Sequence, residues 1–496
     1  MMDPAGLQVL AAALRGVAEE MGAALVRSAH SANIKERRDC STALFDERGR
    51  MIAQAEHIPV HLGALPDAIA AVRAHDPAPE DVFILNDPYA GGTHLPDITV
   101  VSRTAVGFAA TRAHHADVGA AEPGSLPAGS RRLDEEGVVI PPTRLDEATL
   151  DELTARMRNP GERRGDLRAQ LGANRLASRR IEDLCARRGR EVVLAAMDEL
   201  HDYAERRVRA AIAALPDGRF EASDLLEAEE GDLEVRVAVT IEGDELEIDF
   251  AGTAPQHEGN LNCPLAVTRS ASYFVIRCLT DPDAPASGGA FAPVTVRAPE
   301  GSLVNARPPA AVAAGNVETS SRIADVVFLA LGEAIDVPAQ GQGTMNNVTL
   351  GSDDFTYYET IGGGQGACPD ADGPSAVHVA MSNTLSTPTE ALELAYPIRV
   401  ERNAMRLGSG GAGRRSGGDG VVRELRVLED CRLSLVGERR VRAPQGARGG
   451  KPGLPGRNLL NGEELPAKIT RGLRAGDVVR VETPGGGGYG PVPKGQ

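Results

Sequence analysis

The feature that most constrains the fold is a change of hydrophobic pattern near residue 216. From 146 to 215 the chain is rich in Ala, Leu, Arg and Glu with few helix-breaking residues, which predicts an almost wholly helical segment. The Pro-Asp-Gly sequence at 216–218 ends this pattern. Alternating apolar residues follow at 233–241 and 245–250, on either side of a Glu-Gly-Asp turn, which predicts a hairpin. Helices and hairpins in separate stretches are typical of an α+β protein.

Before residue 146, helix-like and strand-like segments occur together. Apolar residues at helical spacing predict helices over 6–30 and 64–75. Shorter apolar runs predict strands within 42–53, at 82–85, and at 98–106 and 108–113, where Gly107 separates two strands expected to pair. Further helices are expected at 265–279 and 318–335. We therefore predict an α+β region over 1–216 and a β-richer region with glycine loops over 217–496.

Charge and composition narrow the classes of function. The net charge of −17 would repel a phosphate backbone, and aromatic residues are only 3% of the chain, so nucleic acid is not expected as a partner. No apolar stretch approaches the length of a membrane span, and the N-terminus lacks the pattern of a signal peptide. The six cysteines are scattered without a CxxC pair, which argues against a zinc ribbon or a disulfide framework. A cytoplasmic protein is the expectation.

Histidines are concentrated near the N-terminus, where seven of the ten lie in the first 115 residues. Three motif-like strings contain most of them: HIPVHLG at 57–63, NDPYAGGTHLPD at 86–97 and RAHHADVG at 112–119. The second string holds His94 and Asp97 three residues apart with a proline between them. An imidazole and a carboxylate suit a divalent ion such as zinc, iron or manganese.

The predicted hairpin indicates a third ligand. If strand 108–113 returns beside strand 98–106, it brings His114 or His115 back towards Asp97. A His/Asp/His set that leaves coordination positions open is what a catalytic metal needs, either to polarise a carbonyl or to lower the pKa of water. The alternative is a hydrogen-bonded His–Asp pair in a loop, which the sequence leaves open.

The sequence favours structural roles for the other reactive residues. Pro59 disfavours a helix between His57 and His61, so these two are not expected to form a zinc pair and are assigned structural roles. Cys40 follows a basic cluster that could favour a thiolate, but no Cys-His-Asn pattern accompanies it, so a structural cysteine is expected. The glycine strings at 362–366 and 408–418 lack a P-loop lysine and are interpreted as tight turns or active-site loops.

A series of blocks along the chain resembles the hydantoinase B/oxoprolinase family. Besides the three histidine strings, the blocks are NIKERRD at 33–39, GDLRAQ at 165–170, DFAGT at 249–253, MSNT at 381–384 and GSGG at 408–411. They occur in order across almost the whole chain. The resemblance implies an A-type partner subunit that binds ATP and phosphorylates the oxygen of the substrate, and a hetero-oligomer in which this chain binds no nucleotide itself.

The resemblance also implies roles for individual residues. The related large subunit of acetone carboxylase holds manganese through a His-x-x-Asp and a later histidine, so His94, Asp97 and His115 are assigned as ligands of manganese or zinc. His114 remains open as the third ligand in place of His115, and is otherwise assigned to catalysis with Asp117. Asp117 would act as general base, or as an acceptor that orients a ligand histidine.

The function expected from this resemblance is ATP-dependent hydrolysis of a cyclic amide ring, with this chain as the metal-binding catalytic subunit. Two alternatives stay open. One is the large subunit of a ketone carboxylase, and the other is a non-catalytic scaffold for the A-type partner.

Overall fold

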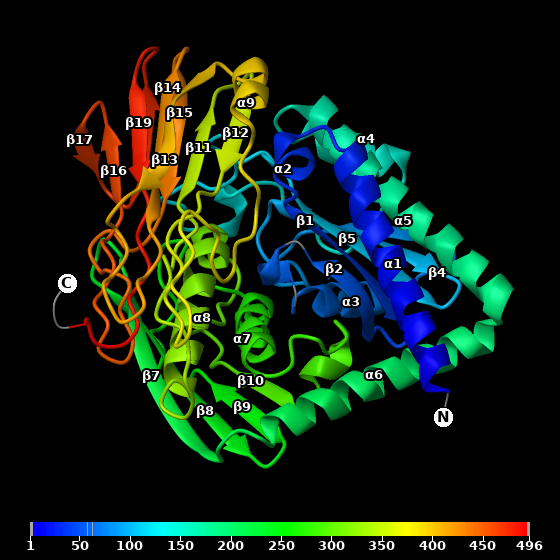
Figure 1. The fold of residues 1–496 in the computed structure, drawn as a ribbon. Coiled ribbons are helices and arrows are strands. Elements are labelled where there is room, and N and C mark those ends of the chain that lie inside the picture. Colours follow the sequence, from blue (N-terminus) through cyan, green and yellow to red (C-terminus); the bar gives the residue numbers. More distant parts are fainter. Residues whose placement is uncertain (1–2, 57, 62, 494–496) are drawn as a thin grey trace.

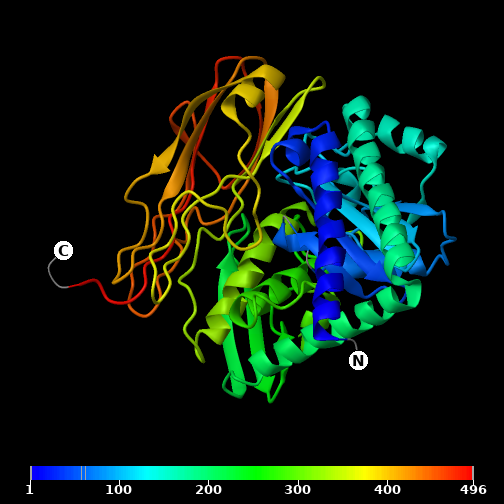
Figure 2. The same ribbon diagram turned by 45° about the vertical axis from the view of Figure 1, so that its right-hand side comes forward.

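The computed structural model describes residues 3–56, 58–61 and 63–493, so His57 lies outside the described residues. Within these ranges no helix is both long and apolar enough to cross a lipid bilayer. Helices and several small sheets are mixed along the chain, which confirms the α+β prediction. The N-terminal sheet with α1 and α5 lies on one side of the molecule and the C-terminal sheets lie on the other (Figures 1 and 2).

A six-stranded sheet in the order β2-β1-β5-β4-β3-β6 forms the centre of the N-terminal part, and all its neighbouring strands are antiparallel. Its strands are β1 (Cys40–Asp46), β2 (Met51–Glu56), β3 (Val82–Leu85), β4 (Asp97–Thr104), β5 (Gly107–His114) and β6 (Thr143–Arg144). The predicted pairing of the strands on either side of Gly107 is confirmed, because β4 and β5 form a continuous antiparallel ladder.

Helices cover both faces of this sheet. The N-terminal helices are α1 (Pro4–Ser28), α2 (Ala32–Lys35), α3 (Leu65–Arg73), α4 (Glu147–Ala155), α5 (Pro160–Arg188) and α6 (Arg190–Ile212). Apolar side chains of α1, α5 and α6 share a core with one face of the sheet, and α3 packs on the other face. Helix α1 begins where the Asp3 side chain accepts a hydrogen bond from the Gly6 amide (3.1 Å), which satisfies a free helix-end donor.

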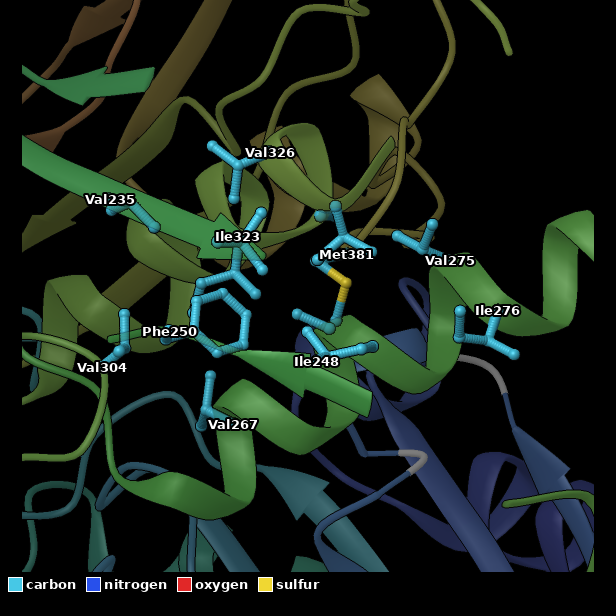
Figure 3. Close-up of a cluster of buried hydrophobic side chains, with 14 of the residues drawn as sticks. Val235, Ile248, Phe250, Val267, Val275, Ile276, Val304, Ile323, Val326 and Met381 are labelled. Carbon is cyan, nitrogen blue, oxygen red and sulfur yellow. The ribbon is translucent and has the colours of Figure 1, made fainter. Parts of the chain in front are cut away.

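The middle of the chain forms the largest core. Strands β7 (Gly218–Leu226), β8 (Leu233–Glu242), β9 (Glu245–Asp249) and β10 (Val294–Arg297) form a sheet, with α7 (Leu265–Leu279) and α8 (Ser320–Leu331) packed against it. Figure 3 shows Met381, from a later loop, inserted among side chains of α7, α8 and β9. Ile58, Val60 and side chains of α6 belong to the same core, which therefore crosses the change of pattern at residue 216.

The helix predicted at 318–335 differs from the structure at both ends. A π-helical turn, Gly315–Thr319, precedes α8, and α8 ends at Leu331 before Gly332. A side chain at Gly315 would meet the Asn262 carbonyl oxygen at 1.8 Å, so the helix approaches a neighbouring loop more closely than any other residue allows. The turn places Asn316 and Val317 beside a buried cavity described below.

Two antiparallel sheets form the C-terminal part, in the orders β12-β11-β15-β18 and β13-β14-β19-β16-β17. Their strands are β11 (Asn347–Gly351), β12 (Thr356–Glu359), β13 (Ile398–Arg406), β14 (Gly420–Val427), β15 (Cys431–Val436), β16 (Arg457–Leu460), β17 (Glu463–Leu465), β18 (Lys468–Leu473) and β19 (Val478–Glu482). Helix α9 (Thr389–Ala395) packs beside β13. One core joins the two sheets.

The glycine strings form a layer of closely packed backbones instead of the predicted tight turns. Segments 362–373, 408–420, 445–456 and 484–490 hydrogen-bond to one another through backbone groups, for example Gly411 N to Gly486 O (2.8 Å). In 362–366 and 408–418 only Gly408 has a left-handed φ, so turn geometry is not what requires these glycines. They are required because a side chain would collide with the neighbouring backbone.

Replacing Glu318 by Gln is expected to reduce the loss of stability as the pH rises from about 4.5 to about 7. Glu318 is fully buried on the π-helical turn, and burial together with the charge of Glu438 raises its pKa to about 7. The folded carboxyl therefore keeps its proton up to about pH 7, whereas the unfolded one loses it near its ordinary pKa. Its stabilising contribution is complete below the unfolded pKa and is lost as pH rises through the folded pKa, a total of about 3 kcal/mol.

Thermal denaturation of the wild type and the Glu318→Gln variant at about pH 5 and about pH 8 measures this effect. We expect the melting temperature of the variant to fall less between the two pH values. Equal falls for both proteins would show that Glu318 ionises normally in the folded state.

Candidate metal centre

The β4–β5 hairpin brings three ligand-type side chains together. Asp97 is the first residue of β4 and His114 the last residue of β5, and the two lie directly opposite in the ladder. Asp97 Oδ1 lies 3.1 Å from His94 Nε2 and 3.1 Å from His114 Nδ1, and the two nitrogens are 3.3 Å apart. Each of the three side chains is at least 96% buried. One oxygen of Asp97 and one ring nitrogen of each histidine therefore converge on a single point.

The spacing of these atoms fits a divalent ion. Ligand atoms about 2.1 Å from one ion, at angles between octahedral and tetrahedral, lie roughly 3.0–3.4 Å apart. The three observed separations fall within that interval. Among the described residues, these three form the His/Cys/Asp/Glu group whose ligand atoms lie close enough together to hold a metal ion. The donor set of two imidazoles and one carboxylate is of the kind that binds divalent ions.

The remaining oxygen of Asp97 is held by two neighbours. Thr93 Oγ1 donates a hydrogen bond to Asp97 Oδ2 (2.7 Å), and His61 Nε2 lies 3.4 Å from the same oxygen. His61 is itself anchored through Nδ1, 3.0 Å from Ser41 Oγ in β1. Burial alone would raise the pKa of Asp97, but the imidazoles of His94 and His61 hold it well below the ordinary value. Asp97 is therefore an ionised, oriented carboxylate, as a metal ligand needs to be.

The loop that carries His94 is fixed by Asn86. The Asn86 side chain donates to the Leu95 carbonyl (2.8 Å) and the Val138 carbonyl (2.9 Å) and accepts from the Ile140 amide (2.7 Å). A side chain at Gly92 would meet the Asn86 carbonyl oxygen at 2.3 Å, so only glycine permits the loop to close this tightly. The position of His94 is thus fixed by the Asn86 side chain and by the close backbone approach at Gly92, both within its own motif.

The structure places His115 away from this group. Successive residues at a strand end point in opposite directions, and His115 Nε2 lies 3.0 Å from Gln170 Oε1 on α5. Burial lowers the pKa of His115 to about 4. Gln170 in turn donates to the Ile98 carbonyl (3.0 Å), so His115 joins the sheet to α5. His114, the alternative that the sequence left open, is the histidine that lies beside His94 and Asp97.

Asp117 is occupied by structural hydrogen bonds. Its carboxylate accepts from the Gly119 and Gly124 amides (2.7 Å each) and from Arg158 Nη1 (2.7 Å). Ser125 and Thr356 hydroxyls add longer contacts. Asp117 does not line the buried cavity beside His94, Asp97 and His114, which is described next. A carboxylate held by this many donors secures the loop after β5.

The converging side chains line a buried cavity between the two parts of the chain. Its volume of about 20 Å³ has room for one or two water-sized occupants. Residues before 217 contribute Asp39 and His61 beside the three residues of the group, and residues after 216 contribute Asn316, Met345, Tyr358, Thr360, Ser382 and Thr384. The ring of Tyr358 in β12 stacks on that of His114, with centroids 4.7 Å apart.

Sequence reasoning missed two side chains of this cavity. His61 was assigned a structural role because Pro59 argues against a helix, but a 3₁₀ turn, Pro59–His61, directs it towards Asp97. Asp39 ends the NIKERRD block, but no local spacing marks it as a site residue. The structure brings it to the cavity because its carbonyl accepts from the His114 amide (3.0 Å). Burial raises the pKa of the neighbouring Cys40 thiol, as expected of a structural cysteine.

The chain is thus an α+β protein with a buried His/Asp/His group that could hold a metal ion. The Hydantoinase B/oxoprolinase family model matches residues 3–492. The chain belongs to the hydantoinase B/oxoprolinase family.

Known relatives are similar over nearly the whole chain. 5-oxoprolinase 1 of Arabidopsis thaliana is 39% identical over 96% of this chain, and the chain spans 41% of that relative's length. The B subunit of a putative D-/L-hydantoinase from Pseudomonas sp. is 31% identical over 99% of this chain and 90% of its own. The crystal structure of an ATP-dependent caprolactamase from Pseudomonas jessenii has a TM-score of 0.92 with 29% identity, covering 100% of this chain and 93% of that one.

Proposed function

We propose that this chain is the B-type subunit of an ATP-dependent hydrolase that opens a cyclic amide ring. The observation that carries the proposal is the convergence of His94 Nε2, Asp97 Oδ1 and His114 Nδ1 in a buried cavity. Relatives named as a 5-oxoprolinase, a putative hydantoinase and an ATP-dependent caprolactamase support a cyclic amide as the substrate class.

His94, Asp97 and His114 would hold the ion, with Thr93 and His61 orienting the carboxylate. A divalent ion bound there would supply Lewis-acid polarisation of the ring carbonyl, with manganese or zinc as the candidates. Tyr358 fixes the plane of the His114 ring by stacking, and its hydroxyl donates to Asn347 Oδ1 (2.9 Å). The chain's own residues thereby present a rigid donor set in a site from which bulk water is excluded.

Proton transfer is assigned to Asp39 in place of Asp117. Asp39 is 6% exposed and faces the cavity, whereas the oxygens of Asp117 are taken up by loop amides and Arg158. Metal content distinguishes proton transfer from a further ligand role for Asp39: an Asp39→Asn variant that keeps its ion but loses turnover supports proton transfer. Loss of the ion in that variant would reassign Asp39 as a ligand.

The partner in this proposal is an A-type subunit that binds ATP. The chain has no P-loop sequence, and an unactivated amide ring is hydrolysed slowly, so phosphorylation of the amide carbonyl oxygen by the partner makes chemical sense. The cavity of about 20 Å³ is too small for a ring, so side chains that line it must move to admit the substrate.

Co-purification of the chain with its A-type partner tests the function. We expect release of the ring-opened product from hydantoin, 5-oxoproline or caprolactam only when both subunits and ATP are present. Full-rate ring opening by this chain alone without ATP would contradict the two-subunit proposal. Incorporation of labelled bicarbonate into a ketone without ring opening would identify a carboxylase, and a metal-free chain that only binds its partner would identify a scaffold.

A further inference from the structure

A second, larger cavity lies beside β2, the edge strand of the N-terminal sheet. It has a volume of about 760 Å³ and is bounded by α1, β2, α6 and the segment 282–286. In Figure 1, α1 runs past β2 with α6 beneath it. No residue lines both this cavity and the one at the metal-type centre. It is therefore a separate space, which the proposed hydrolysis does not use.

The lining shows that the cavity is an elongated groove along a strand edge. Residues of α1 from Gln8 to Arg27 line it, a span of about 28 Å at 1.5 Å per residue. Four consecutive residues of β2, Ile52–Ala55, line it as well. Because successive side chains point to opposite faces of a sheet, four consecutive lining residues mean that the groove follows the edge of the strand. β2 is the outermost strand of its sheet, and on that side it pairs with no other described strand.

These dimensions match an extended polypeptide. About 28 Å corresponds to roughly eight residues of strand at ~3.4 Å each. The wall formed by α1 carries Ala11, Ala12, Gly22 and Ala23, small residues that let another backbone approach closely. An edge strand with free amides and carbonyls is the usual template for an added strand.

The groove is basic, although the chain as a whole carries a net charge of −17. Its lining contains five arginines, Arg15, Arg27, Arg38, Arg207 and Arg277, against the acids Glu19 and Asp283. Arg15 pairs with Glu19 and Arg207 with Asp281. Arg27 and Arg38 are exposed and form no ion pair within the described residues. Two guanidinium groups are therefore available to anionic side chains.

We propose that this groove binds an extended, acidic peptide segment of a partner protein, which adds to the edge of β2. Its backbone pairs with β2, and its carboxylates meet Arg27 and Arg38. The proposal stands independently of the hydrolytic function, because it uses none of the residues of the metal-type centre.

Fluorescence anisotropy with a fluorescein-labelled octapeptide of alternating Glu and Val tests this binding on the purified full-length chain. We expect saturable binding that weakens as salt rises, and at least tenfold weaker binding by a charge-reversed Lys/Val peptide. The double variant R27E/R38E should bind the Glu/Val peptide at least tenfold more weakly. The control R402E, an exposed arginine of β13 outside the groove, should bind like the wild type.

Two further probes test the mode of binding. Methylating alternate backbone nitrogens of the Glu/Val peptide should abolish binding, because a methylated nitrogen cannot donate a hydrogen bond to the edge of β2. Equal binding of the methylated peptide, or equal weakening by R402E, would overturn the strand-addition proposal. Displacement of the peptide by inorganic phosphate at the same concentration would overturn it in favour of a small-anion site.

Discussion

Replacing His94 by Ala is expected to lower turnover of the assembled enzyme by about 10³-fold or more. The imidazole contributes one of the three atoms that converge in the cavity, at 3.1 Å from Asp97 Oδ1 and 3.3 Å from His114 Nδ1. In the proposed function, losing it would remove a ligand of the ion and with it the polarisation of the substrate carbonyl, which would be worth several kcal/mol in the transition state. Initial rates of ring opening by the complex, with ATP in excess, measure the effect.

The matched control is His75→Ala. His75 is exposed just after α3 and its ring contacts that of Phe83, with centroids 5.7 Å apart. This variant should turn over like the wild type. Comparable rates for His94→Ala and His75→Ala would mean that the buried group plays no part in the chemistry.

Replacing Gly486 by Ala is expected to destabilise the C-terminal part by about 3 kcal/mol or more. A side chain at Gly486 would lie 2.0 Å from the Gln365 carbonyl oxygen and 2.7 Å from the Gly366 amide nitrogen. Its own amide donates to the Gly418 carbonyl (2.9 Å), so the segment cannot shift without breaking a hydrogen bond. Backbone surrounds the added methyl group on both sides and cannot move away easily, so the overpacking would destabilise the fold. The melting temperature should fall by at least about 5 °C.

Gly472→Ala is the control for this prediction. Gly472 lies in β18, has no left-handed φ, and a side chain there would meet nothing within 4 Å. Its melting temperature should stay within about 2 °C of the wild type, because an open site tolerates a methyl group. Equal losses for both variants would show that the glycine layer is not close-packed in solution.

Local periodicity was sufficient to predict the framework around the site. The paired strands on either side of Gly107 follow from short apolar runs, and the long helices after residue 146 follow from a composition rich in Ala, Leu, Arg and Glu with few helix breakers. The hairpin also predicted that a histidine would return to Asp97, since antiparallel pairing fixes which residues lie opposite.

The remaining features depend on contacts between distant segments. Which of His114 and His115 faces Asp97 depends on which side of the sheet α5 covers. Gln170 of α5 contacts the ring of His115, so His114 is the histidine that faces Asp97. Tyr358 reaches His114 from β12, in a part of the chain far beyond the hairpin. The glycine strings resemble turns locally, and only the packing of four separate segments shows why they lack side chains. None of these contacts has a local signal.

The metal content of two variants tests whether His94, Asp97 and His114 hold a divalent ion. Wild-type chain, His114→Ala and His115→Ala are each purified, loaded with manganese or zinc and dialysed, and the bound ion is measured by elemental analysis alongside a circular dichroism spectrum. We predict about one ion per wild-type chain, retention of that ion by His115→Ala, and its loss from a folded His114→Ala, because only His114 lies beside His94 and Asp97. A folded His114→Ala variant that keeps a stoichiometric ion would contradict the assignment of His114 as a metal ligand.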